Sequence, residues 1–239
     1  MRGPEGACRR CAGARSSSPP PHKSAIRTSR VQWRAIGRSL ITTHPNLQPL
    51  LTDRPQRAKL LDAMVRVVAE KGYESATVAD AVRLARVSRG TFYELFDSKE
   101  ACLAAAYRLG IEVLSARVGR AVRGADDWRQ ELRLGLRAYL ETFDEEPLFA
   151  RVYLLEWAPV AAERDAAIRR FARRYGASFA RGGIHVPEQA LFLLAAGVHE
   201  LTCAHVRGGG RAADLEEVLV GCALRLACPQ TPWAQASAR

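Results

Sequence analysis

The residues best suited to chemistry lie together in one short stretch of the chain, residues 88–99. It contains Ser88, Arg89, Gly90, Thr91 and Tyr93 within six positions. An arginine can bind a guanine edge through two hydrogen bonds, and a threonine can bond a base or touch a thymine methyl group. A tyrosine hydroxyl suits a phosphate oxygen. These residue types point to contact with nucleic acid and not to catalysis.

Helices must position these side chains, and the sequence supplies the signals for them. Thr77 is suited to cap a helix over 78–85, Ser88 to cap one over 89–96, and Ser98 to cap one that starts at Lys99. Gly90 has no side chain and lets the second of these helices approach a DNA backbone closely. Two short helices joined by a tight turn form the layout of a helix-turn-helix DNA reader.

Two further cations and an apolar set complete the expected unit. Lys99 begins a helix, where its charge opposes the helix dipole, so a phosphate partner would explain it. Arg86 lies in the turn and can also reach phosphate. The apolar residues expected to lock these helices onto a first helix over 55–71 are Ala81, Leu84, Val87, Phe92 and Phe96.

The segment from about Arg57 to Ala104 resembles the N-terminal domain of TetR-type (tetracycline-repressor-like) transcriptional regulators. The matching runs are Thr77-Val78-Ala79-Asp80, Val87-Ser88-Arg89-Gly90-Thr91-Phe92-Tyr93 and Phe96-Asp97-Ser98-Lys99-Glu100. The resemblance implies an all-helical homodimer that binds a near-palindromic operator in double-stranded DNA and is released by a small-molecule effector. Carried over by position, the DNA contacts are Thr77, Arg89, Thr91, Tyr93 and Lys99, while Ser88 and Gly90 shape the helix and Phe92 and Phe96 are core.

Two positions depart from the family pattern. Arg86 stands where the turn before the recognition helix usually has glycine. A positive φ at this residue would cost on the order of 1 kcal/mol, which a phosphate contact could partly offset. Leu95 stands where the family often has histidine or another polar aromatic residue, so one backbone contact is expected to be missing.

The rest of the chain predicts further helices and no strands, because helical spacing of apolar residues persists and strand alternation does not. The expected fold is all-α: a three-helix DNA-binding domain over 53–98, then a larger helical ligand-binding and dimerisation domain over 99–229. A disordered basic leader over 1–52 and a flexible tail over 230–239 flank them. Helices are expected at about 99–122, 126–143, 147–157, 160–181, 187–207 and 213–228, with starts marked by Asp126, Pro147, Pro159, Pro187 and Asp214.

The last two helices are the most apolar. A protein of this size can bury such a pair in its own core, whereas the resemblance implies that they pair with their twofold mates as a four-helix interface. The residues expected at that interface are Leu191, Leu194, Val198, Leu201, Leu215, Val218, Leu219 and Cys222. An effector pocket is expected between the other helices, lined by Phe143, Tyr153, Trp157, Tyr175 and His199, although most aromatic residues in a helical domain are simply core.

Composition narrows the remaining possibilities. Of the net charge of +11, most comes from residues 1–54, so the basic balance is a weak argument for nucleic acid. This leader could be a misassigned start, a basic arm along DNA, or a transit-like segment. The Cys8-x-x-Cys11 pair lacks a second ligand pair, so no metal and no cofactor is expected. No apolar run approaches the length of a membrane span, and free cysteines fit a reduced, cytoplasmic protein.

The sequence therefore predicts a sequence-specific DNA-binding regulator, specifically a ligand-released homodimeric repressor. An alternative is a helical protein-interaction module that has lost specific DNA binding. An enzyme is not expected, because no nucleophile–base pair, metal set or phosphate-binding loop is found.

Overall fold

The structure, a computed structural model, describes residues 55–156 and 158–227, which all belong to one compact unit of the chain. Every regular element among these residues is helical, which confirms the all-α prediction. The leader, Asp53, Trp157, the Cys8–Cys11 pair and the tail after residue 227 lie outside the described residues.

Three helices form the N-terminal part of the described chain: α3 (Pro55–Lys71), α4 (Val78–Ala85) and α5 (Arg89–Leu95). Helix α3 buries a continuous apolar face that includes Leu60, Leu61 and Met64, and both shorter helices contact it. Phe92 and Phe96 are buried as predicted. Their rings lie 5.8 Å apart between centroids, which fixes α5 on this small core.

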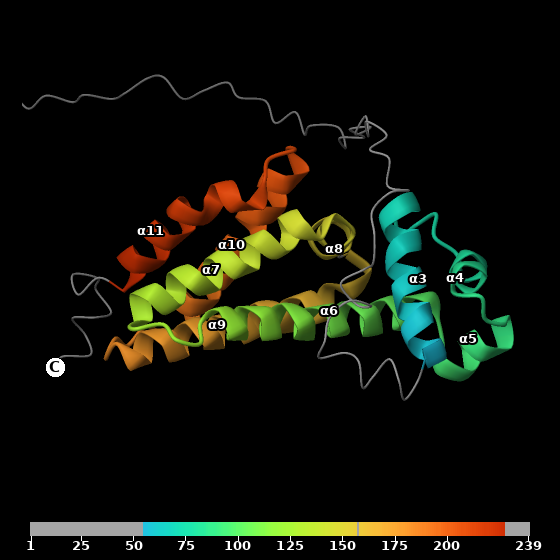
Figure 1. Ribbon diagram of the computed structural model, residues 1–239, viewed down its shortest axis with the longest axis horizontal. Coiled ribbons are helices and arrows are strands. Elements are labelled where there is room, and N and C mark those ends of the chain that lie inside the picture. Colours follow the sequence, from blue (N-terminus) through green and yellow to red (C-terminus); the bar gives the residue numbers. More distant parts are fainter. Residues whose placement is uncertain (1–54, 157, 228–239) are drawn as a thin grey trace, which may run out of the picture. The chain divides into compact units, whose positions relative to one another are not determined.

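The larger part of the described chain contains five long helices with short elements between them. Helix α6 contacts α3, α7 and α9, so it joins the helix-turn-helix unit to the rest, while α10 packs on α9 and α11 packs on α7 (Figure 1). The long helices are α6 (Lys99–Ala121), α7 (Trp128–Glu145), α9 (Ala161–Arg181), α10 (Glu188–Arg207) and α11 (Glu216–Leu226); the short elements are α8 (Pro147–Ala150), η3 (Arg151–Leu155), η4 (Ala158–Val160) and η5 (Ala212–Leu215).

The predicted helix caps hold with one exception. The side chains of Thr77, Ser88 and Ser98 each accept a hydrogen bond from a backbone amide three residues on, which satisfies a free donor at the helix start. Helix α7, however, is capped by Asp127 and not by Asp126: the Gln130 amide donates to Asp127 Oδ1 at 2.8 Å.

The predicted small core includes one residue too many. Leu84 is 50% exposed, because α4 turns Ala81 and Ala85 toward α3 and leaves Leu84 beside them on an open groove. Val87 is half-buried. The two small alanines bring α4 close to α3 and form the contact for which Leu84 was also predicted.

The helix predicted over 147–157 is interrupted. Helix α8 ends at Ala150 and continues as the π-helical turn η3. The Tyr153 hydroxyl of this turn lies 2.6 Å and 2.7 Å from the carbonyl oxygens of Ala106 and Tyr107 on α6. A Cβ at Gly110 would lie 1.9 Å from that hydroxyl, so the tyrosine occupies the space that the glycine leaves open.

The helix predicted over 213–228 begins instead as the 3-10 turn η5 and becomes regular only at Glu216. Its start is fixed from a distance, because the carboxylate of Asp144 on α7 accepts hydrogen bonds from the Ala212 and Ala213 amides at 2.7 Å and 3.0 Å.

Helix α10 is long and apolar enough to cross a membrane by length and composition alone. It packs along α9, with Ala195, Val198 and Cys203 buried in the chain's own core. Other apolar residues of this helix are exposed, among them Leu193 and Leu201.

Candidate functional site

The exposed face of α5 carries the side chains predicted to read DNA. Arg89, Gly90 and Tyr93 are all exposed. The Arg89 guanidinium carbon lies 5.8 Å from the centroid of the Tyr93 ring. The cation and the ring thus form one surface at the start of the helix, where a base edge and a neighbouring phosphate could each find a partner.

Two of the predicted DNA contacts also have partners within the chain. The Thr91 hydroxyl lies 2.9 Å from Ser88 Oγ, which also accepts a hydrogen bond from the Thr91 amide. The Thr77 hydroxyl donates to Asp80 Oδ2 at 2.8 Å. Both threonines therefore stabilise the starts of their helices.

Within the part of the chain that the structure describes, no contact and no backbone angle requires glycine at position 90. Its φ is not positive, and a Cβ built there would meet only the Ser88 hydroxyl oxygen, at 3.5 Å. A glycine in a helix costs about 0.5–1 kcal/mol relative to alanine. The missing side chain at Gly90 therefore leaves the start of α5 open to close approach by an outside molecule.

Arg86 adopts the strained conformation that the sequence departure suggested. Its φ and ψ are 55° and 47°, in the left-handed region, where it ends α4. Among the described residues, Arg86 is the only residue other than glycine that has a positive φ. Its side chain is exposed and lines the surface groove between α3 and α4. The left-handed backbone of Arg86 therefore costs about 1 kcal/mol, and its guanidinium faces solvent.

Lys99 is held by the turn between α3 and α4. Its Nζ donates to the carbonyl oxygens of Tyr73 and Ala76, both at 3.0 Å, and lies 4.0 Å from the centroid of the Tyr73 ring. These contacts give the lysine a structural role that the sequence did not reveal, since its partners are more than twenty residues away. Its contact with DNA remains a prediction.

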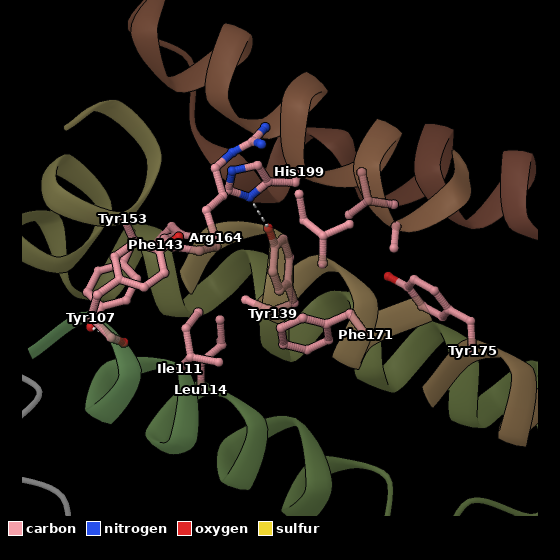
Figure 2. A pocket seen from close by; sticks show the side chains of 14 residues that line it. Tyr107, Ile111, Leu114, Tyr139, Phe143, Tyr153, Arg164, Phe171, Tyr175 and His199 are labelled. Atoms are coloured by element: carbon pink, nitrogen blue, oxygen red, sulfur yellow. Dashed lines mark hydrogen bonds between the residues drawn. The ribbon is translucent and has the colours of Figure 1, made fainter. Parts of the chain in front are cut away.

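An interior cavity of about 30 Å³ lies between α6, α7, α9 and α10. Four of the residues predicted to bind an effector line it: Phe143, Tyr153, Tyr175 and His199 (Figure 2). Trp157 lies outside the described residues. Sequence reasoning did not single out Tyr107 or Arg164, which also line the cavity, because only the packing of α6 and α9 brings them there.

His199 is one of the polar residues that line this cavity. Its Nδ1 lies 3.4 Å from the Tyr139 hydroxyl, and its Nε2 lies 3.5 Å from Cys203 Sγ. Burial, together with the weaker effect of the nearby Arg164 cation, lowers the pKa of His199 to about 4. The imidazole is therefore neutral at neutral pH, and the cavity presents aromatic rings with a neutral donor–acceptor pair.

The cavity and the helix-turn-helix unit are connected through the π-helical turn η3. Tyr153 lines the cavity, and Glu156, which ends the turn, accepts a hydrogen bond from the Tyr73 amide at 3.1 Å. Tyr73 is the residue whose carbonyl also binds Lys99. One short turn thus contacts both the cavity and the segment that precedes α4.

An exposed apolar face runs along α10 and α11. Leu193, Leu201 and Val218 are 70%, 41% and 55% exposed, and Cys222 is exposed beside Val218 on the next turn. Leu201, Val218 and Cys222 belong to the set predicted for the dimer interface, which stays a prediction. Leu191, Val198, Leu215 and Leu219 are buried in the chain's own core, because they face α9 and α7, and Leu194 is half-buried.

Comparison with known proteins agrees with this geometry. The model of the family described as "Bacterial regulatory proteins, tetR family" matches residues 60–106. The HTH-type transcriptional regulator BetI of Ectopseudomonas mendocina (strain ymp) is 31% identical over 122 residues, which cover 49% of this chain and 60% of that protein. The chain thus spans less than two thirds of that curated relative.

Solved structures extend the likeness over most of the helical domain. The fatty acid degradation regulator FadR of Bacillus halodurans superposes with a TM-score of 0.63 at 18% identity, over 71% of this chain and 95% of that one. FadR of Bacillus subtilis, solved in complex with stearoyl-CoA, gives 0.62 at 17% identity, over 69% and 96%. At these identities the likeness shows the fold alone. The helix-turn-helix of this chain therefore matches the tetR family of bacterial regulatory proteins over residues 60–106, and the rest of the described helices share the fold of the solved regulators.

Proposed function

We propose that this transcriptional regulator is a homodimeric repressor that binds a near-palindromic operator and is released by a small-molecule effector, in the cytoplasm. The observation that carries the proposal is the face formed by Arg89, Gly90 and Tyr93. This face gathers a cation, a hydroxyl and an exposed glycine at the start of α5, and the exposed cation of Arg86 ends the preceding helix. Thr77, Ser88, Thr91 and Lys99 support that face from within the chain.

Dimerisation follows from the size of the reading surface. One recognition helix reaches only a few base pairs, and a twofold dimer doubles the site and fixes the spacing of its halves. The exposed residues Leu193, Leu201 and Val218 support a partner surface on α10 and α11, because exposed leucines and valines at helical spacing favour burial against a second copy.

Effector control is proposed to pass through η3. A ligand that enlarges the cavity must displace rings such as Tyr153, and movement of that turn would alter the Glu156 bond to the Tyr73 amide. The relatives support a ligand of some kind, since one FadR structure holds stearoyl-CoA. The change in operator affinity is limited by the difference in the ligand's affinity for the two states.

The test is in vitro selection of random duplex DNA by the purified full chain, at one stated salt concentration. We expect enrichment of an inverted repeat, with half-sites spaced for two recognition helices. Enrichment of nothing above background would contradict the proposal and favour a protein-interaction module. Enrichment of a single, unrepeated half-site would support sequence-specific DNA recognition and contradict binding as a dimer.

A further inference from the structure

A second interior cavity lies next to the first and shares part of its wall. It measures about 20 Å³ and is lined by residues of α6, α7 and α9. Tyr139, Phe171 and Tyr175 line both cavities. The Tyr175 hydroxyl points from α9 toward the side chains that line the first cavity (Figure 2). Movement of these three rings would therefore join two small spaces into one channel along the bundle.

Arg174 links this second cavity to the surface. Its side chain lines both the cavity and a surface groove of about 780 Å³ between α6, α7 and α9. Its guanidinium lies over Gly119, where an added Cβ would be 3.7 Å from each terminal nitrogen. The guanidinium thus packs over the backbone of α6 at the cavity mouth.

Among the described residues, Arg174 has no carboxylate within ion-pair distance, whereas two other arginines of α9 do: Arg164 pairs with Asp165 and Glu200, and Arg170 pairs with Glu112. Glu131, the carboxylate closest in the cavity wall, binds Arg181, with Nε at 2.9 Å from Oε2. Burial lowers the pKa of the Arg174 guanidinium below its ordinary value, yet an arginine stays charged at neutral pH.

The walls beyond Arg174 are mostly apolar, and the two other charged residues that line them are paired: Arg164 with Glu200, and Glu131 with Arg181. The titratable side chains that line the two cavities, apart from tyrosines, are Arg164, Arg174, Glu131 and the neutral His199. The groove outside also holds Asp126, which is exposed, and Asp127, which caps α7. A half-buried, unpaired cation at the mouth of an aromatic channel suits an anion whose other end is apolar.

We propose that the effector is an organic acid with an apolar body, whose carboxylate binds Arg174 and whose body occupies the joined cavities. This inference rests on the proposed effector control, and it adds the chemical class of the ligand. Neither cavity holds such a body in the present conformation, so binding must move Tyr139, Phe171 or Tyr175. The same acid would leave the Arg181–Glu131 pair in place.

Calorimetric titration of the full chain tests this with matched ligands: 4-phenylbutyrate against 4-phenylbutyramide, and octanoate against octanamide. We expect at least one acid to bind about tenfold or more tightly than its amide, because the amide cannot form the charge-assisted contact. Arg174→Gln should abolish that preference. Arg173→Gln, a change to the exposed neighbour on the outer face of α9, should retain it.

A second variant tests the channel without touching the charge. Gly135 lines the second cavity, and a Cβ there would lie 3.4 Å from Val122 and 3.6 Å from Val118. Gly135→Leu should fill this space and weaken binding of both acid and amide, while the circular dichroism spectrum stays helical. Equal affinity for acid and amide, a preference that survives Arg174→Gln, or no binding of either acid would overturn the inference.

These outcomes are separate from those of the DNA selection. If the protein selects an inverted repeat but binds neither acid, the proposed ligand class is wrong and the proposed DNA-binding function stands. If the acid binds through Arg174 but no DNA is enriched, the ligand site stands and the proposed function is wrong.

Discussion

At the scale of single residues, Gly90 combines a folding cost with an external role. It is exposed, its backbone is compatible with any residue, and its neighbours leave room for a methyl group. A larger residue at position 90 should therefore stabilise the fold and weaken binding to DNA.

Gly90→Ala should raise the free energy of unfolding by about 0.5–1 kcal/mol, because alanine loses less backbone entropy in a helix. It should weaken operator binding about tenfold, since the added methyl group meets the DNA backbone. Urea denaturation and fluorescence anisotropy on the same preparation measure both effects. An increase in stability with unchanged operator affinity would mean that α5 does not approach DNA at this residue.

His199 makes stability depend on pH in a defined window. Its folded pKa of about 4 lies below the ordinary value of 6.5, so the unfolded chain binds the proton first. The free energy of unfolding should therefore fall as pH decreases from about 6.5 toward 4 and stay level above that window, as far as this residue is concerned.

The measurement is the slope of unfolding free energy against pH for the parent protein, His199→Gln and His185→Gln. We expect the slope between pH 6.5 and 4.5 to become shallower only in His199→Gln, because His185 is exposed. The lowered carboxylate pKa values, such as those of Glu112 and Glu216, start from 4.5 and act below this window. An identical slope in all three proteins would contradict a buried, neutral histidine.

At the scale of elements, helices with local signals were predictable and their irregular junctions were not. Thr77, Ser88 and Ser98 predict helix starts from the sequence, because a capping side chain bonds an amide only three residues away. The π-helical turn η3 depends on Tyr153 meeting Gly110 on another helix, and η5 depends on Asp144. Such long-range contacts leave no periodic pattern in the sequence.

The candidate site divides in the same way. Phe143, Tyr153, Tyr175 and His199 were predicted as cavity residues because aromatic and polar residues on central helices tend to face inward. The place of Arg174 in the cavity wall and the contact of Glu156 with the Tyr73 amide were not predicted, because a charged residue in a sequence reveals neither its burial nor its partner.

The Glu156 contact should order the segment that precedes α4. Glu156→Ala removes the acceptor of the Tyr73 amide, so that amide should exchange with solvent about ten- to a hundredfold faster. Glu74→Ala, which removes an exposed carboxylate next to Tyr73, should leave the rate unchanged. Hydrogen exchange read at Tyr73 measures this, and equal rates in both variants would exclude η3 as the link between cavity and DNA reader.

At the scale of the whole molecule, the exposed apolar face of α10 and α11 is proposed to hold the dimer. Val218→Glu places a charge at this face, and a twofold interface would contain the charge twice. The variant should be monomeric by light scattering and should bind the operator at least about tenfold more weakly. Ala162→Glu adds the same charge on exposed α9 and should remain dimeric.

A Val218→Glu protein that keeps the mass and operator affinity of the parent would place the partner surface elsewhere. A parent protein that is monomeric by light scattering would remove the dimer altogether.

The most direct test of the central claim compares operator and random DNA for Arg89→Ala, with Arg83→Ala as control. Both arginines are exposed, but Arg83 pairs with Asp80 on α4 and Arg89 lies at the start of α5. We predict that Arg89→Ala lowers affinity for the operator by about 1–3 kcal/mol and leaves random DNA almost unchanged, while Arg83→Ala retains the discrimination. Equal losses on both DNAs for Arg89→Ala would contradict the account, because α5 would then bind DNA without reading it.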